Sequence, residues 1–187
     1  MSERILVAVA WPYANGSLHL GHLAGANLPA DIFAKYHRLK GNDVVMVSGS
    51  DQHGTPITLR AEQEGVKPQE IVDRYHKGFL ECWRGMGIDF DLFTTTGTKN
   101  HEAVVQDMFL KLRDNGYIYK AAMNSPYCHV CRRFLPDRYV QGTCPHCGNE
   151  DARGDQCDNC GRTLDPKDLI GITCRISGDT PRIRETE

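Results

Sequence analysis

The cysteines of this chain are concentrated in one stretch, and their spacing limits what that stretch can fold into. Cys82 stands alone, whereas the other seven of the eight lie between Cys128 and Cys174. Six of these seven form three C-x-x-C pairs, which read CHVC, CPHC and CDNC. A secreted disulfide scaffold spreads its cysteines through the chain, whereas C-x-x-C pairs in a reducing compartment are typical of zinc knuckles. We therefore expect a metal-bearing C-terminal part and an N-terminal part that folds by ordinary apolar packing.

One set of four cysteines has the spacing of a complete zinc site. Cys144, Cys147, Cys157 and Cys160 read as C-x2-C, nine residues, C-x2-C, and a glycine follows each pair. Zinc prefers four thiolates in a tetrahedron, and two such turns supply them from a short chain. We predict a closed, structural zinc site here. Buried thiols or disulfides are the alternative.

The first part of the chain alternates between apolar runs and amphipathic segments. Residues 5–10 and 43–49 are rich in branched side chains, as is typical of parallel strands buried on both faces. Residues 88–93 could form a further short strand. Helices are expected over residues 18–39, 68–85 and 99–114, with Pro29 as a kink or break in the first. The candidate buried positions of that helix are Leu20, Leu23, Leu28, Ile32 and Phe33.

This alternation of strands and helices predicts an α/β fold with a parallel sheet. Ligands of such sheets bind beyond the carboxyl ends of the strands. The polar loops WPYANGS (residues 11–17) and SGSDQHGTP (residues 48–56) both follow predicted strands. We therefore expect them to meet at one edge of the sheet. After Tyr119 the pattern changes to Gly, Pro, Cys and charged residues, so a domain boundary is expected near residues 119–126.

Charge and hydropathy narrow the class of protein. The 22 basic residues against 24 acidic ones give a formal net charge of −2, which by itself indicates no nucleic-acid partner. The N-terminus has a short apolar run without a signal-peptide pattern, and no apolar stretch approaches the length of a membrane span. We expect a soluble, cytoplasmic protein with no membrane partner.

His19 and His22 flank Leu20 and Gly21 at the predicted start of a helix. This spacing puts both imidazoles on one face, and the free N–H groups and positive dipole of a first turn favour a bound phosphate. Gly21 leaves room for a flat ring or a phosphate beside the backbone. For an isolated pair, however, solvated or helix-capping histidines are the better interpretation. A zinc site is disfavoured because the i, i+4 spacing is absent.

The surrounding segments change this interpretation, because together they resemble one enzyme family. PYANGSLHLGH after a buried strand resembles the HIGH-type motif of class I aminoacyl-tRNA synthetases, specifically the methionyl-tRNA synthetases. SGSDQHGTP resembles their second active-site segment, and FLPDRYVQGTCPHCG, ARGDQCDNCG and LDPKDLI resemble their zinc-bearing connective insertion. The resemblance covers essentially the whole chain. It implies the first half of a Rossmann-like nucleotide-binding domain with an inserted zinc-knuckle module.

The resemblance also implies roles for particular residues. His19 and His22 would contact the ATP phosphates and stabilise the transition state, and Asn15 and Gly21 would lie along the adenosine. The walls of the methionine pocket would be Ala10, Trp11 and Tyr13, and Asp51 would receive the ammonium group. Apolar walls and one carboxylate suit such a ligand. From the residues alone, Trp11 and Tyr13 could instead pack in the core and Asp51 could cap a turn or helix. His53 stays unassigned.

Cys128 and Cys131 need two further ligands if they bind metal. Members of the family with two zincs supply these from another C-x-x-C pair downstream, but here that position reads CRIS, with Cys174 followed by Ser177. Either a second zinc uses three thiolates with His129, another side chain or water, or the pair stays reduced and metal-free. The sequence leaves both alternatives open.

By the same resemblance, residues 1–118 are the Rossmann-like catalytic half, residues 119–175 the zinc-binding insertion, and residues 176–187 the start of the return to the catalytic domain. The implied activity is that of a methionine–tRNA ligase, with ATP and Mg²⁺, methionine and tRNA(Met) as substrates and partners. No segment resembling K-M-S-K-S occurs. We therefore expect an N-terminal fragment, inactive alone, that lacks the rest of the catalytic domain and the anticodon-binding domain.

Two other functions remain open at this point. The chain could belong to another class I aminoacyl-tRNA synthetase, which amino-acid affinities would distinguish. It could also be a non-catalytic zinc-knuckle module that binds RNA or protein, although it lacks a basic face rich in aromatic residues. Binding of methionine or an ATP analogue would favour the synthetase.

Overall fold

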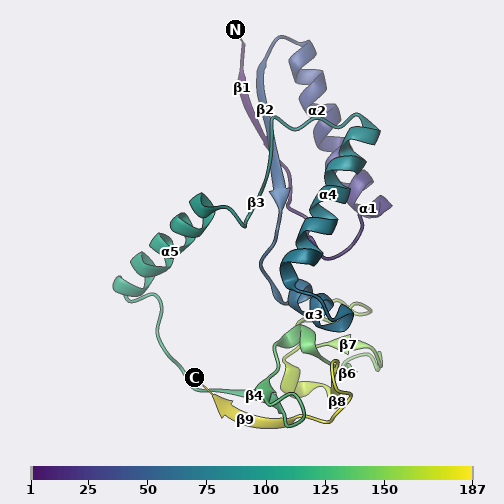
Figure 1. Cartoon of the computed structure of the whole chain (residues 1–187), viewed down its shortest axis with the longest axis vertical. Helices are drawn as coiled ribbons and strands as arrows, with labels where there is room; N and C mark the ends of the chain where they lie inside the picture. The colour runs from purple at the N-terminus through teal and green to yellow at the C-terminus, as the bar shows by residue number, and fades with distance from the viewer. Residues whose placement is uncertain (1, 187) are drawn as a thin grey trace. The chain divides into compact units, whose positions relative to one another are not determined.

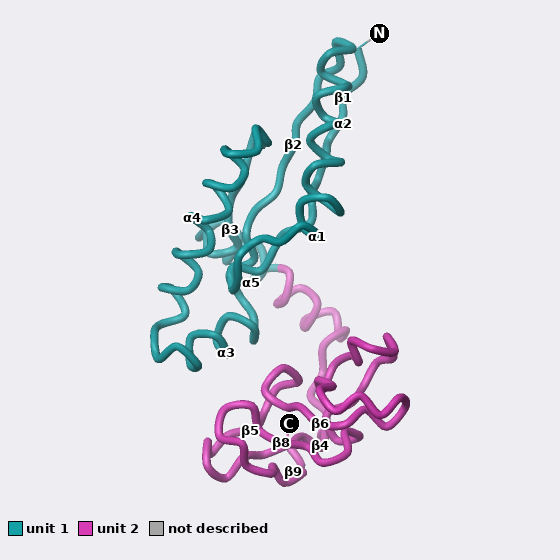
Figure 2. The backbone as a smooth tube through the Cα atoms, turned by 90° about the vertical axis from the view of Figure 1, so that its right-hand side faces the viewer, with its two compact units in different colours: residues 1–107 teal, residues 108–187 magenta. Residues whose placement is uncertain are grey.

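The chain folds into two compact units, as seen in a computed structural model that describes residues 2–186. The units comprise Met1–Asp107 and Met108–Glu187 and have separate colours in Figure 2. The division falls within a helix, α5 (Lys99–Asp114). Each unit has its own sheets.

Unit 1 is built on a parallel sheet of three strands. They are β1 (Arg4–Ala8), β2 (Asp43–Ser50) and β3 (Leu92–Thr95), in the order β1-β2-β3. The helices are α1 (Leu20–His22), α2 (Leu28–Leu39), α3 (Thr55–Glu64) and α4 (Pro68–Met86), as labelled in Figure 1. The predicted parallel α/β arrangement is confirmed, although β3 begins later than residue 88.

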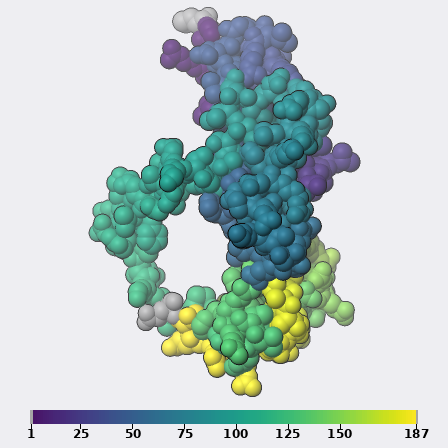
Figure 3. Space-filling view, in the orientation of Figure 1, coloured from purple at the N-terminus to yellow at the C-terminus, as the bar shows by residue number. Residues whose placement is uncertain are grey.

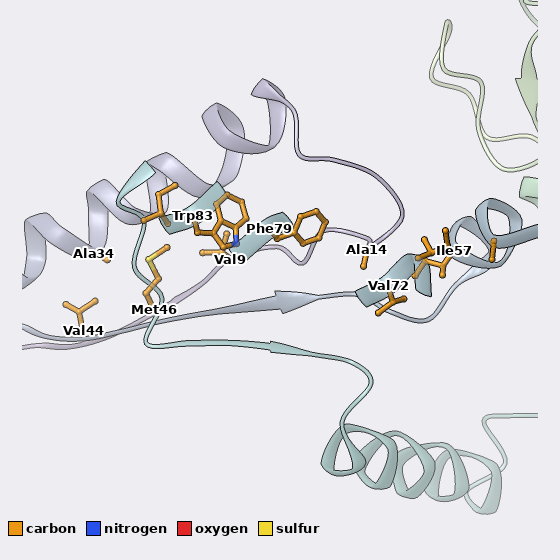
Figure 4. Close-up of a cluster of buried hydrophobic side chains, with 12 residues drawn as sticks. Val9, Ala14, Ala34, Val44, Met46, Ile57, Val72, Phe79 and Trp83 are labelled. Carbon is orange, nitrogen blue, oxygen red and sulfur yellow. The ribbon is translucent and has the colours of Figure 1, made fainter. Parts of the chain in front are cut away.

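The core of unit 1 lies on one face of this sheet. Met46 of β2 packs in one cluster with Ala34 of α2 and with Phe79 and Trp83 of α4 (Figure 4). A sequential strand order with right-handed crossovers places both connecting helices on the same face. Both helices also reach the surface, as the blue-violet and teal bands of Figure 3 show. Only one flank of each is therefore buried.

The other face of the sheet is open among the described residues. Leu6 of β1 is 69% exposed and Val45 of β2 is 45% exposed, although both belong to apolar runs. The expectation that these strands are buried on both faces is therefore wrong for this chain. The reason is that α2 and α4 cover the same face, and no described element covers the opposite one.

The segment predicted as one helix over residues 18–39 has a wider turn in its middle. A π-helical stretch, η1 (Leu23–Asn27), joins α1 to α2, and the Asn27 Nδ2 donates to the His22 carbonyl at 2.7 Å. Pro29 lies in the first turn of α2, where its missing N–H costs nothing, so it does not break the helix.

Three of the predicted core positions of this segment are wrong. Leu23 and Leu28 pack against the core, whereas Leu20, Ile32 and Phe33 are exposed. The buried positions of the segment are instead Asn27, Asp31 and Ala34, small or polar residues that an apolar pattern does not mark.

Unit 2 consists of short antiparallel strands and turns. One sheet has the order β5-β4-β9, formed by β4 (Met123–Cys128), β5 (Arg133–Phe134) and β9 (Arg182–Thr186). The other has the order β7-β6-β8, formed by β6 (Val140–Thr143), β7 (Ala152–Arg153) and β8 (Ile170–Cys174). Two 3-10 turns, η2 (Asp137–Tyr139) and η3 (Pro166–Asp168), complete the unit.

The predicted helix at residues 99–114 is confirmed as α5, but none of its described side chains is buried, and Val104, Met108 and Phe109 are exposed.

Within residues 2–186, no helix combines the length and the apolar character that crossing a membrane requires.

Candidate functional site

The two polar loops meet at the carboxyl edge of the parallel sheet. Tyr13 and Asp51 form a parallel bridge beyond the ends of β1 and β2. The Asp51 N–H donates to the Pro12 carbonyl at 2.9 Å, and the Ala14 N–H donates to the Asp51 carbonyl at 2.9 Å. The prediction that residues 11–17 and 48–56 share this edge is confirmed.

His19 and His22 form a reciprocal cap at the start of α1. His19 is the N-cap residue, in an extended conformation, and its Nδ1 accepts from the Gly21 N–H at 3.1 Å. The Nδ1 of His22 accepts from the His19 N–H at 3.3 Å. The two rings stack with their centroids 3.8 Å apart. Both histidines thus cap the helix, as expected for an isolated pair of this kind. The Nε2 atoms take no part in the cap.

These caps determine which nitrogen of each ring carries the proton. A neutral imidazole has one donor and one acceptor nitrogen, so a ring whose Nδ1 accepts from the backbone is protonated on Nε2. Burial, followed by the proximity of His19, lowers the pKa of His22 and favours its neutral form. Each ring therefore offers an Nε2–H donor at a helix N-terminus.

Gly21 is required for this arrangement. A Cβ on Gly21 would lie 2.9 Å from Cε1 and 3.0 Å from Nδ1 of His19, closer than ordinary contacts allow. A side chain there would displace the His19 ring. The glycine between the two histidines thus permits the cap as well as access for a ligand.

A third loop, which the sequence analysis missed, holds the Asp51 carboxylate. Asp51 Oδ1 accepts from the His53 N–H at 3.1 Å and from the Thr96 hydroxyl at 3.4 Å. Thr96 follows β3, and its Oγ1 also accepts from the Gln52 N–H at 2.8 Å. The run of threonines at residues 94–96, directly after the short strand expected at residues 88–93, is the signal that the sequence offers for this loop.

Trp11 lies over the end of β2, at the mouth of a hollow. A Cβ on Gly49 would stand 2.7 Å from Cζ3 of Trp11, so the glycine makes room for the indole. Trp11, Thr95, His101 and Val104 are among the residues that line a hollow of about 380 Å³. Trp11 is therefore partly exposed rather than a core residue, and it borders a space of ligand size.

The other predicted contact residues lie along the same segment. Ala10 is exposed just beyond β1, and Asn15 is half-buried in the turn before His19. The Tyr13 ring is exposed on one side and lies next to Gly54, where a Cβ would be 3.2 Å from its Cε1. The parallel backbone bridge between Tyr13 and Asp51 holds these two residues side by side.

Behind Asp51, a buried polar contact links β2 to α4. The Ser50 hydroxyl lies 2.8 Å from Nδ1 of His76, and Gln52 Nε2 donates to the same hydroxyl at 3.3 Å. Burial lowers the pKa of His76, and the nearby Asp73 opposes this effect. His76 is thus a neutral partner that orients the end of β2. The sequence gives no indication of this role, because a single histidine in an amphipathic helix forms no pattern.

In unit 2, the four cysteines predicted to bind zinc come together. The Sγ atoms of Cys144, Cys147, Cys157 and Cys160 all lie within 4.8 Å of one another. The Cys147–Cys157 and Cys144–Cys160 Sγ distances are 3.6 and 3.9 Å, too long for disulfides. A tetrahedral ion with metal–sulfur bonds of about 2.3 Å requires sulfurs about 3.8 Å apart. The cluster could therefore hold a metal ion such as zinc.

Hydrogen bonds to sulfur favour the thiolate form of part of this cluster. The His146 N–H donates to Cys144 Sγ at 3.4 Å, and the Asn159 Nδ2 donates to Cys147 Sγ at 3.5 Å. The backbone N–H groups of Cys160 and then Asn159 outweigh burial and lower the pKa of Cys157 to about 6. Thiolates are the form that binds metal.

A second group of thiols lies in the same unit. The Sγ atoms of Cys128, Cys131 and Cys174 also lie within 4.8 Å of one another. The Ser177 Oγ is 3.3 Å from Cys128 Sγ. His129 is not part of this group, and its ring instead contacts Tyr127 edge-on. The second group thus has three thiols and a hydroxyl.

Comparison with known proteins identifies the family of this chain. The family described as tRNA synthetases class I (M) matches residues 5–187. Two proteins named methionine–tRNA ligase, from Dehalococcoides mccartyi strain CBDB1 and Thermomicrobium roseum, are 59% and 63% identical over all 187 residues. The chain covers 34% and 32% of their lengths, so it spans about a third of these relatives.

A solved structure shows the same fold. Mycobacterium tuberculosis methionyl-tRNA synthetase, in complex with methionyl-adenylate, superposes with a TM-score of 0.64 at 21% identity. The superposition covers 100% of this chain and 31% of that one. The parallel sheet, the histidine motif, the cysteine clusters and the family match lead to one conclusion: this chain belongs to the class I tRNA synthetases, in the family designated M.

Proposed function

We propose that this chain carries the amino-acid activation site of a methionine–tRNA ligase. The observation that carries the proposal is the reciprocal cap of His19 and His22, which holds two Nε2–H donors at a helix N-terminus directly after the loop that pairs with Asp51. The names of the relatives support the choice of methionine.

In this proposal, activation of methionine needs no covalent bond to the protein. The carboxylate of methionine attacks the α-phosphate of ATP, which binds with Mg²⁺, and pyrophosphate leaves. The Nε2–H groups of His19 and His22 donate to phosphate oxygens as negative charge builds up on them. Asn15 and Gly21 lie along the adenosine. Transfer of the methionyl group to tRNA(Met) follows.

The rest of the site holds the amino acid in position. Asp51 pairs with the ammonium group, and its carboxylate is oriented by the Thr96 hydroxyl. Ala10, Trp11 and Tyr13 form the walls around the thioether. Correct positioning of two reactants can remove about 7–11 kcal/mol from a barrier of this type. The hollow beside Trp11 supports a ligand at this place.

We also propose that Cys144, Cys147, Cys157 and Cys160 hold a structural zinc ion. The four sulfurs leave no open coordination position, so the ion contributes to folding and takes no part in the reaction. Structural zinc contributes about 10–16 kcal/mol in small modules.

The same proposal assigns three ranges of the chain to parts of the enzyme. Residues 1–118 form the first half of a Rossmann-like domain, residues 119–175 form the connective insertion, and residues 176–187 begin the return to the catalytic domain. The open sheet face at Leu6 and Val45 and the exposed α5 support the view that further chain completes the domain. A cytoplasmic location fits such an enzyme.

Kinetics of a full-length protein that contains this chain test the proposal. His19→Ala and His22→Ala should lower kcat for pyrophosphate exchange much more than they raise KM for methionine. Leu20→Ala is the matched control, because Leu20 lies between the histidines and its side chain is exposed. An unchanged kcat in both histidine variants would remove them from catalysis. Exchange that is faster with another amino acid would assign a different synthetase.

Ligand binding to the present chain tests the same proposal against a non-catalytic role. Calorimetry with methionine and with a non-hydrolysable ATP analogue should detect weak binding of at least one, reduced by Asp51→Asn or His22→Ala respectively. We expect little or no pyrophosphate exchange from this chain alone. Binding of RNA without either small ligand would favour the zinc-knuckle module.

A further inference from the structure

We propose that Cys128, Cys131, Cys174 and Ser177 form a second metal site. In this site three thiolates and the Ser177 oxygen bind one Zn²⁺ ion, more weakly than the four-thiolate site binds its own. All four residues lie in unit 2.

The turn that contains Ser177 has the backbone of a metal-binding knuckle. The Cys174 N–H donates to the Asp179 carbonyl at 2.8 Å, and the Gly178 N–H donates to the Cys174 carbonyl at 2.8 Å. Gly178 has a left-handed φ of 73°. Ser177 therefore stands at the third position after the first cysteine of the turn, where a second cysteine would provide its sulfur.

The four-thiolate site has the same backbone hydrogen bonds in both of its turns. The Cys144 N–H donates to the Asn149 carbonyl at 2.8 Å, and the Gly148 N–H donates to the Cys144 carbonyl at 3.0 Å. In the second turn, the Cys157 N–H donates to the Arg162 carbonyl at 2.9 Å, and the Gly161 N–H donates to the Cys157 carbonyl at 2.8 Å. The turn at Cys174 has kept this geometry although one thiol is replaced by a hydroxyl.

The first half of the proposed site has the same form. Cys128 pairs with Arg133 across the β4–β5 ladder, and the Cys131 N–H donates to Cys128 Sγ at 3.3 Å. Arg132 follows this pair with a φ of 54°, the one positive φ outside glycine among residues 2–186. L-residues avoid this conformation. The chain therefore keeps the knuckle turn here in spite of an unsuitable residue.

The donor atoms are spaced for one tetrahedral ion. Cys131 Sγ and Cys174 Sγ lie 3.8 Å apart, close to the separation of about 3.8 Å that zinc–thiolate bonds require. The Ser177 Oγ lies 3.3 Å from Cys128 Sγ, near the sulfur–oxygen separation of about 3.5 Å in a mixed site. The Asp179 N–H donates to Ser177 Oγ at 3.3 Å and so orients it. Within the described chain, no further His, Cys, Asp or Glu joins this group.

The serine determines how tightly the ion is held. A neutral hydroxyl is a poorer zinc ligand than a thiolate, because it brings no negative charge to the metal. Changes in the outer shell alone alter metal affinity by about 10–100-fold. Exchange of a direct ligand should alter it by at least as much. The two sites of unit 2 should thus release zinc at clearly different chelator concentrations.

Zinc content and release test the proposal on the present chain. Protein purified with zinc should contain two ions, and a coloured chelator should remove one of them readily. Cys174→Ala should abolish the readily removed ion and leave the other in place. Ser177→Cys should raise the affinity of the weak site by about 10–100-fold or more. Ser125→Cys, which adds a thiol on β4 outside the group, should not.

Cobalt substitution reports the ligands directly. The charge-transfer band of thiolate-bound Co²⁺ should grow from the weak site in Ser177→Cys, because that site gains a fourth thiolate. A single zinc ion in the wild type would overturn the proposal, whatever the zinc content of Ser177→Cys. Two ions that are released together, with no effect of Ser177→Cys, would overturn the role of Ser177.

Discussion

Unit 1 buries Phe79, Trp83 and Met46 against a parallel sheet, whereas the buried side chains of unit 2 include Cys128, Cys144, Cys157 and Cys174 beside a few apolar ones. A fully buried large apolar side chain stabilises a fold by about 1.5–3 kcal/mol, so unit 1 can depend on a sum of such contributions. A small unit with few of them requires a metal or a covalent link. The difference teaches that one short chain can combine two ways of stabilising a fold.

The two ways can be measured separately in the same molecule. Both tryptophans, Trp11 and Trp83, lie in unit 1, so tryptophan emission reports on that unit. All cysteines of the two thiol groups lie in unit 2, so metal content and cobalt spectra report on that one. The following predictions use these two signals.

Loss of the four-thiolate site should have the largest effect. Cys157→Ala removes a ligand of an ion that contributes about 10–16 kcal/mol, which is as large as the usual net stability of a whole domain, about 5–15 kcal/mol. Hydrogen exchange should show that residues 137–174 lose protection, while tryptophan emission stays native. Cys82→Ala, a cysteine outside both groups, is the control. Protected amides in unit 2 after complete metal removal would break the comparison.

Truncation of the core of unit 1 should come next. Phe79→Ala should cost about 3–5 kcal/mol, because the side chain is fully buried in the main apolar cluster. Denaturant titration followed by tryptophan emission measures this loss. The neighbouring Leu80→Ala, at a more exposed position, should cost clearly less. Metal content should be unchanged in both variants, and a loss of zinc in Phe79→Ala would show that the units are not stabilised independently.

A smaller effect is expected at the histidine cap. Gly21→Ala should displace the His19 ring and cost about 0.5–2 kcal/mol, the usual range for loss of an N-cap. Gly25→Ala is the matched control, since a Cβ there meets nothing within 4 Å. Imidazole NMR signals should move in the first variant only. Identical spectra in both would show that Gly21 does not hold the cap open.

The smallest effect should be a dependence of unit 1 on pH. The pKa of His22 and that of His76 are lowered in the fold, chiefly by burial. The unfolded chain therefore takes up protons first as the pH falls below about 6.5, and unit 1 loses stability there. Above that pH both histidines are neutral in the folded and in the unfolded chain, so they no longer change the stability of unit 1. Denaturation at pH 7.5 and at lower pH, followed by tryptophan emission, should show a smaller loss for His76→Gln than for His53→Gln. Equal losses would remove His76 from this effect.

Much of the scaffold could be predicted from sequence, for identifiable reasons. Branched apolar runs marked β1 and β2, and the periodicity of residues 68–85 marked α4. Parallel topology then implied that the loops after β1 and β2 meet, as the Tyr13–Asp51 bridge confirms. The spacing of Cys144, Cys147, Cys157 and Cys160 was sufficient to predict that they cluster.

Other features could not be predicted, because they depend on contacts distant in sequence. Thr96 and His76 reach the site only once β3 and α4 lie beside β2. The exposure of Leu6 and Val45 follows from which face the helices cover. The three-thiol group could be considered from sequence, but the position of Ser177 against Cys128 could not.

The π-helical turn η1 holds one residue more than an α-helical turn would. If one of residues 23–27 were deleted, the remaining chain could wind as an ordinary α-helix, with better backbone geometry than before. Because the extra residue is taken up within this one turn, the cap formed by His19 and His22 would keep nearly the same direction relative to α2. A deletion inside α2 itself would instead turn the cap by about 100° relative to the residues beyond the deletion, since each residue of an α-helix advances by that angle. Sequences related to this one should therefore tolerate the loss of one residue in η1 better than a loss within α2.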